Sequence, residues 1–175
     1  MATALTLLVI LGAMFGGALA VDGWRASRLR AWARARGFAA VDRQADGGAL
    51  VAHATRFSTR IRSFGLAFHQ STATDELWLA EHRANVAAGP AEKWHTLVVV
   101  RVPGASWPRA TAGAASGRAL DQVLPALAGW AHGGEVDIEG EFVRWRRQGL
   151  LWPWSVEATL ARGRELAALV TSASR

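Results

Sequence analysis

The sequence predicts an α+β protein, in which one N-terminal transmembrane helix precedes a domain whose antiparallel sheet is covered by two helices. Three observations lead to this prediction: an uncharged apolar run near the N-terminus, a middle section of short strand-like segments, and a C-terminal segment with apolar residues at helical spacing. Beyond the apolar run about 150 residues remain, the size of one ordinary domain. The expected parts are a transmembrane helix at 2–21, a basic stalk at 22–37 and an extramembrane α+β domain at 38–175.

The run from Ala2 to Val21 contains no Asp, Glu, Lys, Arg or His. As a helix, a run of this length rises about 30 Å, which matches the hydrocarbon thickness of a bilayer. Arginines follow the run and no basic residue precedes it, which predicts a single-pass protein of the cell inner membrane, with its N-terminus outside and its domain in the cytoplasm. One alternative stays open, because Ala18-Leu19-Ala20 fits the small-x-small pattern of a signal peptide cleaved at Ala20.

Small residues gather on one side of this helix in its second half. Gly12 and Gly16 form a G-x-x-x-G pair that Ala20 extends, and Ala13 and Gly17 widen the same face. Small side chains let another helix approach closely, so this face is expected to pack against a transmembrane helix of another protein subunit. The span carries no ionisable group, which argues against a proton relay or an ion path.

Residues 22–37 are predicted to continue as a helix up to Gly37, because Ala, Arg and Leu favour helices. Residues 22–62 hold nine basic and three acidic groups, whereas residues 63–175 hold eleven of each. The net charge of +6 therefore lies beside the membrane, where it attracts anionic lipid headgroups, and nucleic acid is not expected as a partner. The expected membrane-surface residues are Trp24, Arg25, Arg28, Arg30, Trp32, Arg34 and Arg36.

The middle of the domain is predicted to form antiparallel strands. Residues 93–102 show the strongest strand pattern, since both faces are largely apolar, as a central strand covered on both sides requires. Asp46-Gly47-Gly48 is typical of a hairpin turn. The other expected strands are 38–43, 49–54, 60–68 and 75–84, followed by a second hairpin formed by 136–138 and 142–145 around Glu139-Gly140-Glu141.

Two helices are expected to cover the sheet. The first follows a long loop at 103–117, and its helical spacing is carried by Leu120, Val123, Leu124 and Leu127, with a kink or an early start at Pro125. The second begins after Ser155, a good N-cap residue. Its apolar face consists of Val156, Leu160, Leu166, Ala167, Leu169 and Val170.

Two segments resemble known proteins: Leu97-Val98-Val99-Val100-Arg101-Val102-Pro103, and Val136-Asp137-Ile138-Glu139-Gly140-Glu141-Phe142-Val143-Arg144-Trp145 with the later Leu160, Leu166, Ala167 and Leu169. Through them the chain resembles an uncharacterised family of bacterial single-span proteins that have a membrane helix, a basic stalk and a sheet domain. The resemblance extends over most of the chain and implies the same layout. That family has no assigned activity, so the resemblance implies no functional residue.

Motifs that carry chemistry are sparse. Cysteine is absent, which excludes disulfides, thiolate metal sites and cysteine nucleophiles. The five histidines match no H-E-x-x-H spacing, and no Walker, dinucleotide or G-x-S-x-G pattern occurs. Glu81, His82 and His95 would supply a carboxylate and two imidazoles for zinc if neighbouring strands brought them together, which the sequence leaves open. We expect no catalytic residue and no cofactor.

Tryptophan and arginine are concentrated late in the domain, and both are enriched at the energetic centres of protein interfaces. The expected partner-contact residues are Arg144, Trp145, Arg146, Arg147, Trp152 and Trp154. The sequence thus favours a non-catalytic accessory or scaffold subunit of a larger membrane complex, for which a respiratory or photosynthetic assembly is conceivable. The alternatives are a membrane-tethered hydrolase or metal-dependent enzyme, and an exported domain with a cleaved signal peptide.

Overall fold

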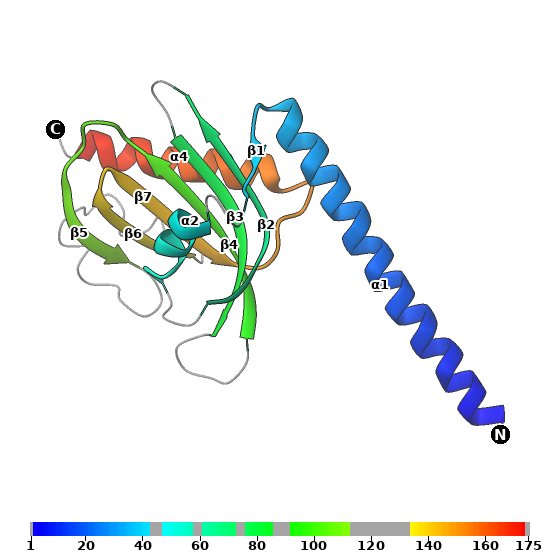
Figure 1. The fold of residues 1–175 in the computed structure, drawn as a ribbon. Helices are drawn as coiled ribbons and strands as arrows, with labels where there is room; N and C mark the ends of the chain where they lie inside the picture. The colour runs from blue at the N-terminus through cyan, green and yellow to red at the C-terminus, as the bar shows by residue number, and fades with distance from the viewer. Residues whose placement is uncertain are drawn as a thin grey trace.

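A computed structural model of the chain describes residues 2–42, 47–57, 61–72, 76–85, 92–112 and 134–173. The fold class is α+β, as the sequence predicts. The helices are α1 (Ala2–Ala35), which projects from the body, α4 (Val156–Ala173), which lies across one face of the sheet, and the short α2 (Gly47–Ala54) on the other face (Figure 1). The strands are β1 (Ala39–Ala40), β2 (Ile61–Ser71), β3 (Glu76–Asn85), β4 (Glu92–Arg101), β5 (Trp107–Ala112), β6 (Gly134–Gly140) and β7 (Phe142–Gln148).

The first helix is continuous across the predicted span and most of the predicted stalk. It stops just before Gly37, whose φ of 75° is the left-handed conformation typical of a helix C-cap. Its C-terminal part packs on the sheet through the buried Leu29 and Ala33, while its N-terminal part extends away from the body (Figure 1). Within the residues that the structure describes, no helix combines the length and the apolar character that a membrane crossing requires.

The strands form one antiparallel sheet in the order β1-β2-β3-β4-β7-β6-β5. β4 lies between β3 and β7 and is buried from His95 to Val100, which confirms the prediction of a central strand covered on both faces. The strands predicted at 60–68 and 75–84 are β2 and β3, and the predicted second hairpin is formed by β6 and β7. Gly140 turns that hairpin with a φ of 60°.

The predicted first hairpin is wrong. Residues 49–54 belong to α2. In the described part of the preceding segment, Ala39 and Ala40 pair with β2 and Val41 donates its backbone N–H to Ala67. The buried side chains of α2 are Leu50, His53 and Ala54, which is helical spacing, and the segment is rich in alanine, the best helix former. The segment is therefore a helix although its sequence pattern predicts a strand, because a helix covers the sheet with one apolar stripe.

The long loop predicted at 103–117 contains a strand, β5, which pairs with β6 at the edge of the sheet. Its register shifts between Trp107 and Ala110, and Pro108 falls in that irregularity. Proline has no N–H to donate and is tolerated in edge strands and bulges, which explains how such a sequence still forms a strand. The helix predicted from Leu120 to Leu127 lies outside the described residues.

Two hydrophobic cores lie on opposite faces of the sheet. Along β3, Leu77 and Leu79 face α1 and α4, whereas Trp78 and Ala80 face α2, as the alternation of a strand requires. The first core also contains Phe38, Phe68, Val98, Ile138, Leu151, Leu160, Leu166 and Val170. The second contains Leu50, Ala54, Leu97 and Val99. The described part of the domain therefore has three layers: α1 and α4, then the sheet, then α2.

Gly163 lies where α4 packs closely against β4. A Cβ at this position would lie 2.4 Å from Cγ1 of Val98, a branched side chain that is itself buried. We expect Gly163→Ala to lower the free energy of unfolding by about 1 to 3 kcal/mol through overpacking, measured by urea titration of the full chain in detergent. Gly23→Ala is the matched control, because no atom lies within 4 Å of its Cβ position. Equal stability of both variants would contradict the close packing of α4 on Val98.

Candidate functional site

A buried ion pair joins α1 to the sheet. Arg25 of α1 donates a hydrogen bond from Nη1 to Oε1 of Glu81 on β3, and the two side chains are only 6% and 1% exposed. Arg25 also donates from Nη1 to the carbonyl oxygen of Leu151 at 2.8 Å and from Nη2 to Oδ1 of Asp22 at 2.8 Å. The pair therefore connects the helix, the sheet and the segment that follows β7.

The carboxylate of Glu81 is held by further bonds. Its Oε1 accepts the backbone N–H of Leu151 at 2.8 Å, and its Oε2 accepts the backbone N–H of Leu66 at 3.2 Å. Burial by itself lowers the pKa of Arg25, but the hydrogen bonds and charges of Glu81 and Asp22 outweigh burial and raise that pKa above its ordinary value. Arg25 thus stays charged, and its ion pair with Glu81 holds α1 on the domain.

The metal site considered for Glu81, His82 and His95 is not formed. His82 and His95 are directly opposite on β3 and β4, with ring centroids 5.4 Å apart. Glu81 pairs with Thr96 and points to the other face of the sheet, where Arg25 occupies it, because neighbouring residues of a strand face opposite ways. Among the described residues no group of three or more His, Asp or Glu side chains is placed to hold a metal ion.

His82 and His95 instead lie near Arg146 on the face that carries α2. His82 is fully buried, and among the described residues neither of its ring nitrogens has a hydrogen-bond partner. Burial, then the charges of His95 and Arg146, lower the pKa of His82 to about 3. Burial and Arg146 also lower the pKa of His95. Both imidazoles are therefore neutral near pH 7 and lie beside the ion pair of Arg146 and Glu135.

A second polar cluster ties α2 to β6 and β7. Arg144 donates from Nη1 to Oδ1 of Asp137 at 2.7 Å and from Nε to Nδ1 of His53 at 3.0 Å. Burial and the charge of Arg144 are the main causes that lower the pKa of His53, to about 4. Burial raises the pKa of Asp137, while Arg144 opposes the rise. His53 accepts a hydrogen bond from a cation, so its Nδ1 must be unprotonated in the folded protein.

The residues predicted to contact a partner do not form one surface. Arg144 and Arg146 are buried against α2 and β6, and Trp145 is buried in the opposite core, because alternate residues of β7 face opposite sides. These three side chains are therefore buried within the described body, and their contact with a partner stays a prediction. Arg147 is partly buried in a cavity of about 450 Å³ that is also lined by Trp145, Ser155, Ala158, Thr159 and Arg162.

Trp152 and Trp154 lie beside α1. The Trp154 ring is 4.6 Å from that of Trp152 in a stacked arrangement and 6.4 Å from that of Trp24, and Arg25 lies over the Trp152 ring at 5.8 Å. Trp154 is 69% exposed and Trp24 is 46% exposed. We call Trp24, Trp152 and Trp154 the tryptophan collar. Sequence reasoning treated them separately, since more than 100 residues lie between Trp24 and the other two.

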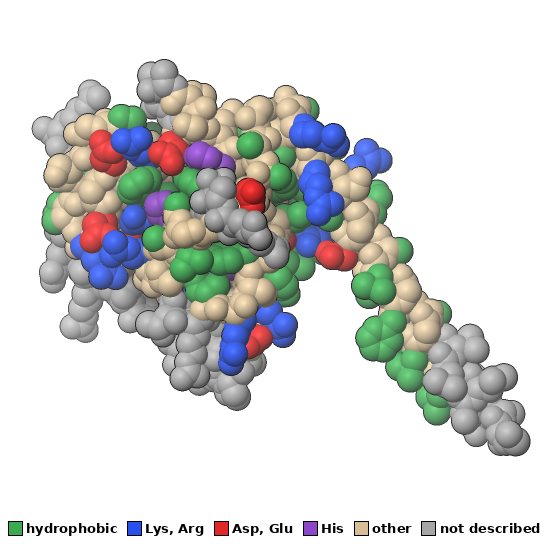
Figure 2. Space-filling view, viewed as in Figure 1, with side chains coloured by type: hydrophobic (Ala, Val, Ile, Leu, Met, Phe, Trp, Pro, Cys, Tyr) green, Lys and Arg blue, Asp and Glu red, His purple; other side chains and the backbone are tan. Residues whose placement is uncertain are grey.

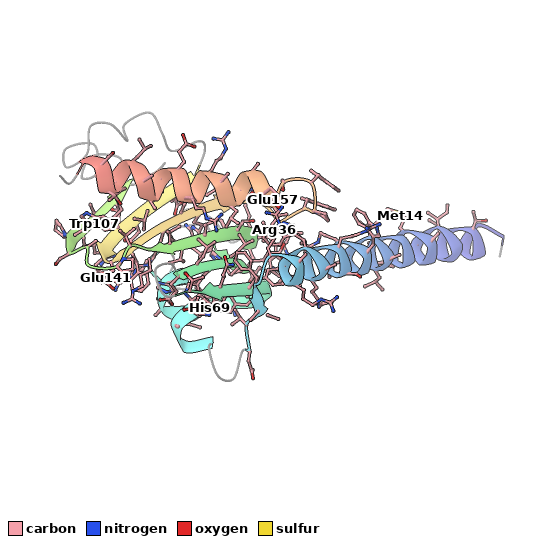
Figure 3. All side chains as sticks on the ribbon, turned by 90° about the horizontal axis from the view of Figure 1, so that it is seen from above. Met14, Arg36, His69, Trp107, Glu141 and Glu157 are labelled. Carbon is pink, nitrogen blue, oxygen red and sulfur yellow. The ribbon has the colours of Figure 1, made fainter. Side chains whose placement is uncertain are left out.

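The predicted membrane-surface residues divide into two groups. Arg28, Arg30, Arg34 and Arg36 are exposed, although Arg36 forms an ion pair with Glu157 at 2.6 Å. Arg25 is buried, and Trp32 is partly buried and donates its indole N–H to Glu157 at 2.8 Å, so these two serve helix docking. Figure 3 shows Arg36 and Glu157 at this junction. Arg25 and Trp32 thus contact the domain, and the membrane-surface role of the group stays a prediction.

The small-residue face of α1 is open. A Cβ added at Gly12, Gly16 or Gly17 would meet no atom within 4 Å, and Ala13 and Ala20 are exposed. Figure 2 shows apolar side chains along the projecting helix and charged side chains gathered where it joins the body. Nothing in the described part of the chain therefore covers this face.

Comparisons with protein families, with curated proteins and with solved structures give no match for this chain. The resemblance to bacterial single-span proteins stays a prediction. The functional argument accordingly rests on the projecting helix, the buried pair at its base and the tryptophan collar.

Proposed function

We propose that this protein is a non-catalytic, single-pass membrane protein of the cell inner membrane, an accessory or scaffold subunit that holds its domain at the cytoplasmic surface. In this proposal residues 2–21 cross the bilayer and the small-residue face contacts a transmembrane helix of another subunit. The domain contacts other subunits as well, and the neighbouring anionic lipids are the remaining partner.

One observation carries this proposal: large apolar side chains stand exposed along a helix that leaves the body. Among the described side chains they are Leu7, Ile10, Leu11, Met14, Phe15, Leu19 and Val21, each about half exposed or more. Water disfavours such a surface, at roughly 25 cal/mol per Å² of apolar area, so it calls for an apolar surrounding. The side chains of residues 2–5, 8 and 9, which belong to the same run, lie outside the described residues.

The way α1 joins the domain supports a scaffold. A flexible linker would let the domain move independently of its anchor, whereas here the helix continues into the core and is held by Arg25, Leu29 and Ala33. The polar clusters under α2 also support a structural role. Their cations, Arg144 and Arg146, form ion pairs with Asp137 and Glu135 across β6 and β7. A fixed orientation suits a subunit that presents one surface to a complex.

The experiment is membrane fractionation of the full chain followed by purification in mild detergent. We expect the protein to stay in the pellet after alkaline carbonate extraction, and external protease to leave the domain intact in whole cells. Release by carbonate would contradict a membrane-spanning anchor. A mature N-terminus at Val21 would support the exported alternative.

The partner is tested with Gly12→Leu and Gly16→Leu. Both positions face open space, so these substitutions are expected to leave folding intact and to favour the helix by up to about 1 kcal/mol each, while preventing close helix packing. Partner protein that co-purifies with the wild type should then be lost. Met14→Leu is the matched control, because residues two apart lie on nearly opposite sides of a helix. Retention of the partner in both Gly variants would exclude this face as the contact.

A further inference from the structure

We propose that the tryptophan collar, Trp24 with Trp152 and Trp154, seats in the headgroup layer of the bilayer and fixes the depth and orientation of the domain. This inference rests on the proposed function, since it requires α1 to cross the membrane. It assigns to the loop after β7 a lipid contact that no part of the sequence pattern indicates. The occupant of the collar is the lipid interface, not a protein partner.

The position of Trp24 along α1 sets the depth of the collar. It stands three residues after Val21, the end of the predicted span. At 1.5 Å per residue its Cα lies about 4.5 Å beyond the hydrocarbon boundary when the helix is upright, which is the level of the lipid carbonyl and glycerol groups. Indole rings favour this level, because their apolar body and polar N–H match its mixed character.

The body places a second exposed indole at the same level. Trp154 lies 6.4 Å from Trp24 and is 69% exposed, which is costly for a tryptophan in water and is relieved in the interface. Trp152 stacks on Trp154 at an interplanar angle of 17° and is itself covered by Arg25. The exposed ring of Trp154 therefore packs on Trp152, which in turn contacts Arg25 of the ion pair that holds α1 on the domain.

The basic side chains around the collar fit a lipid surface, and the exposed carboxylate of Asp22 is paired with Arg25 at 2.8 Å. Arg28 and Arg30 are exposed on α1 within two turns of Trp24, and basic side chains at this level attract anionic headgroups at about 1 kcal/mol each. Two indoles on separate segments, together with the anchor, give contacts that resist tilting of the domain. A protein-binding patch would not need to coincide with the end of the membrane span, which is why lipid is the favoured occupant.

The test uses the absence of cysteine, which allows a unique spin label on the full chain. Trp154→Cys carries the label at the collar, and Trp107→Cys carries it on β5, which lies at the far end of the body from the projecting helix (Figure 3). The protein is reconstituted in vesicles of phosphatidylcholine and phosphatidylglycerol. Collision with an apolar quencher, oxygen, and a polar quencher, a nickel chelate, then reports the depth of each label.

We expect the label at 154 to be several-fold less accessible to the nickel chelate, relative to oxygen, than the label at 107. Equal aqueous accessibility at both sites, in protein that remains in the vesicles after carbonate washing, would overturn the collar while leaving the membrane anchor standing. Protein that carbonate removes from the vesicles would defeat the proposed function itself, and the collar with it. A label at 154 that becomes shielded only when a co-purified protein is added would identify a protein contact and also overturn the proposal.

Discussion

Replacing Arg25 with methionine is expected to lower the free energy of unfolding by about 3 to 5 kcal/mol. Methionine keeps much of the side-chain volume but leaves the carboxylate of Glu81 buried without a counter-charge. The penalty of an unpaired buried charge exceeds what any surface ion pair contributes, which is about 1 kcal/mol or less. Urea unfolding of the full chain in detergent, followed by tryptophan fluorescence, measures the effect.

The double variant Arg25→Met with Glu81→Gln tests whether the loss in Arg25→Met comes from the unpaired charge of Glu81. Glutamine carries no charge, and its single carbonyl oxygen still accepts one of the two backbone N–H groups, those of Leu66 and Leu151, that bond to Glu81. The double variant should therefore be more stable than Arg25→Met alone. Arg34→Met is the matched control on the same helix, where the side chain is exposed, and should change stability by less than about 0.5 kcal/mol. Equal losses for Arg25→Met and Arg34→Met would show that the buried pair does not hold α1.

Acidification from pH 6.5 towards pH 4 is expected to destabilise the protein steeply through His53 and His82. Their pKa values in the folded protein are about 4 and about 3, below the ordinary histidine value, so the unfolded chain binds more protons throughout this interval. Stability therefore rises with pH and is lost as pH falls, by up to about 1.4 kcal/mol per pH unit for each group. The interval from pH 6.5 to 5 is the clearest, because carboxylates contribute below it.

Two substitutions assign this pH dependence. His53→Gln retains an acceptor for the Nε of Arg144, and His82→Phe retains a ring beside His95 and removes two unpartnered nitrogens. Each should reduce the slope of unfolding free energy against pH between 6.5 and 5 by roughly the contribution of one group, and together by both. A slope unchanged in the double variant would show that neither histidine is buried as neutral imidazole.

The elements that could be predicted are those with a strong local pattern. The apolar residues of 93–102 predicted β4 as a central strand, and Glu139-Gly140-Glu141 predicted the hairpin of β6 and β7. Residues 49–54 and 107–112 were misassigned, because the first takes its helical form from packing on the sheet and the second becomes a strand only by pairing with β6. In both segments a tertiary partner outweighs a weak local preference.

The candidate site was less predictable than the fold. Arginine spacing indicated a basic surface after the span, but not that Arg25 alone would turn inward to a carboxylate 56 residues away. Glu81 next to His82 on a strand was a signal that could have been used, since neighbours on a strand face opposite sides and cannot easily share one metal. The pairing of His82 with His95 depended on a register that this sequence does not specify.

The sequence by itself determined the long N-terminal helix with its small-residue face, the position of the basic segment after it and where the main strands lie along the chain. These are properties of contiguous residues, so propensity, periodicity and charge reveal them directly. Only the tertiary structure decided that Arg25 and Trp32 dock the helix, that Arg144, Trp145 and Arg146 are buried, and that Trp154 stands beside Trp24. Such contacts join residues far apart in the chain, and no local pattern encodes the packing that brings them together.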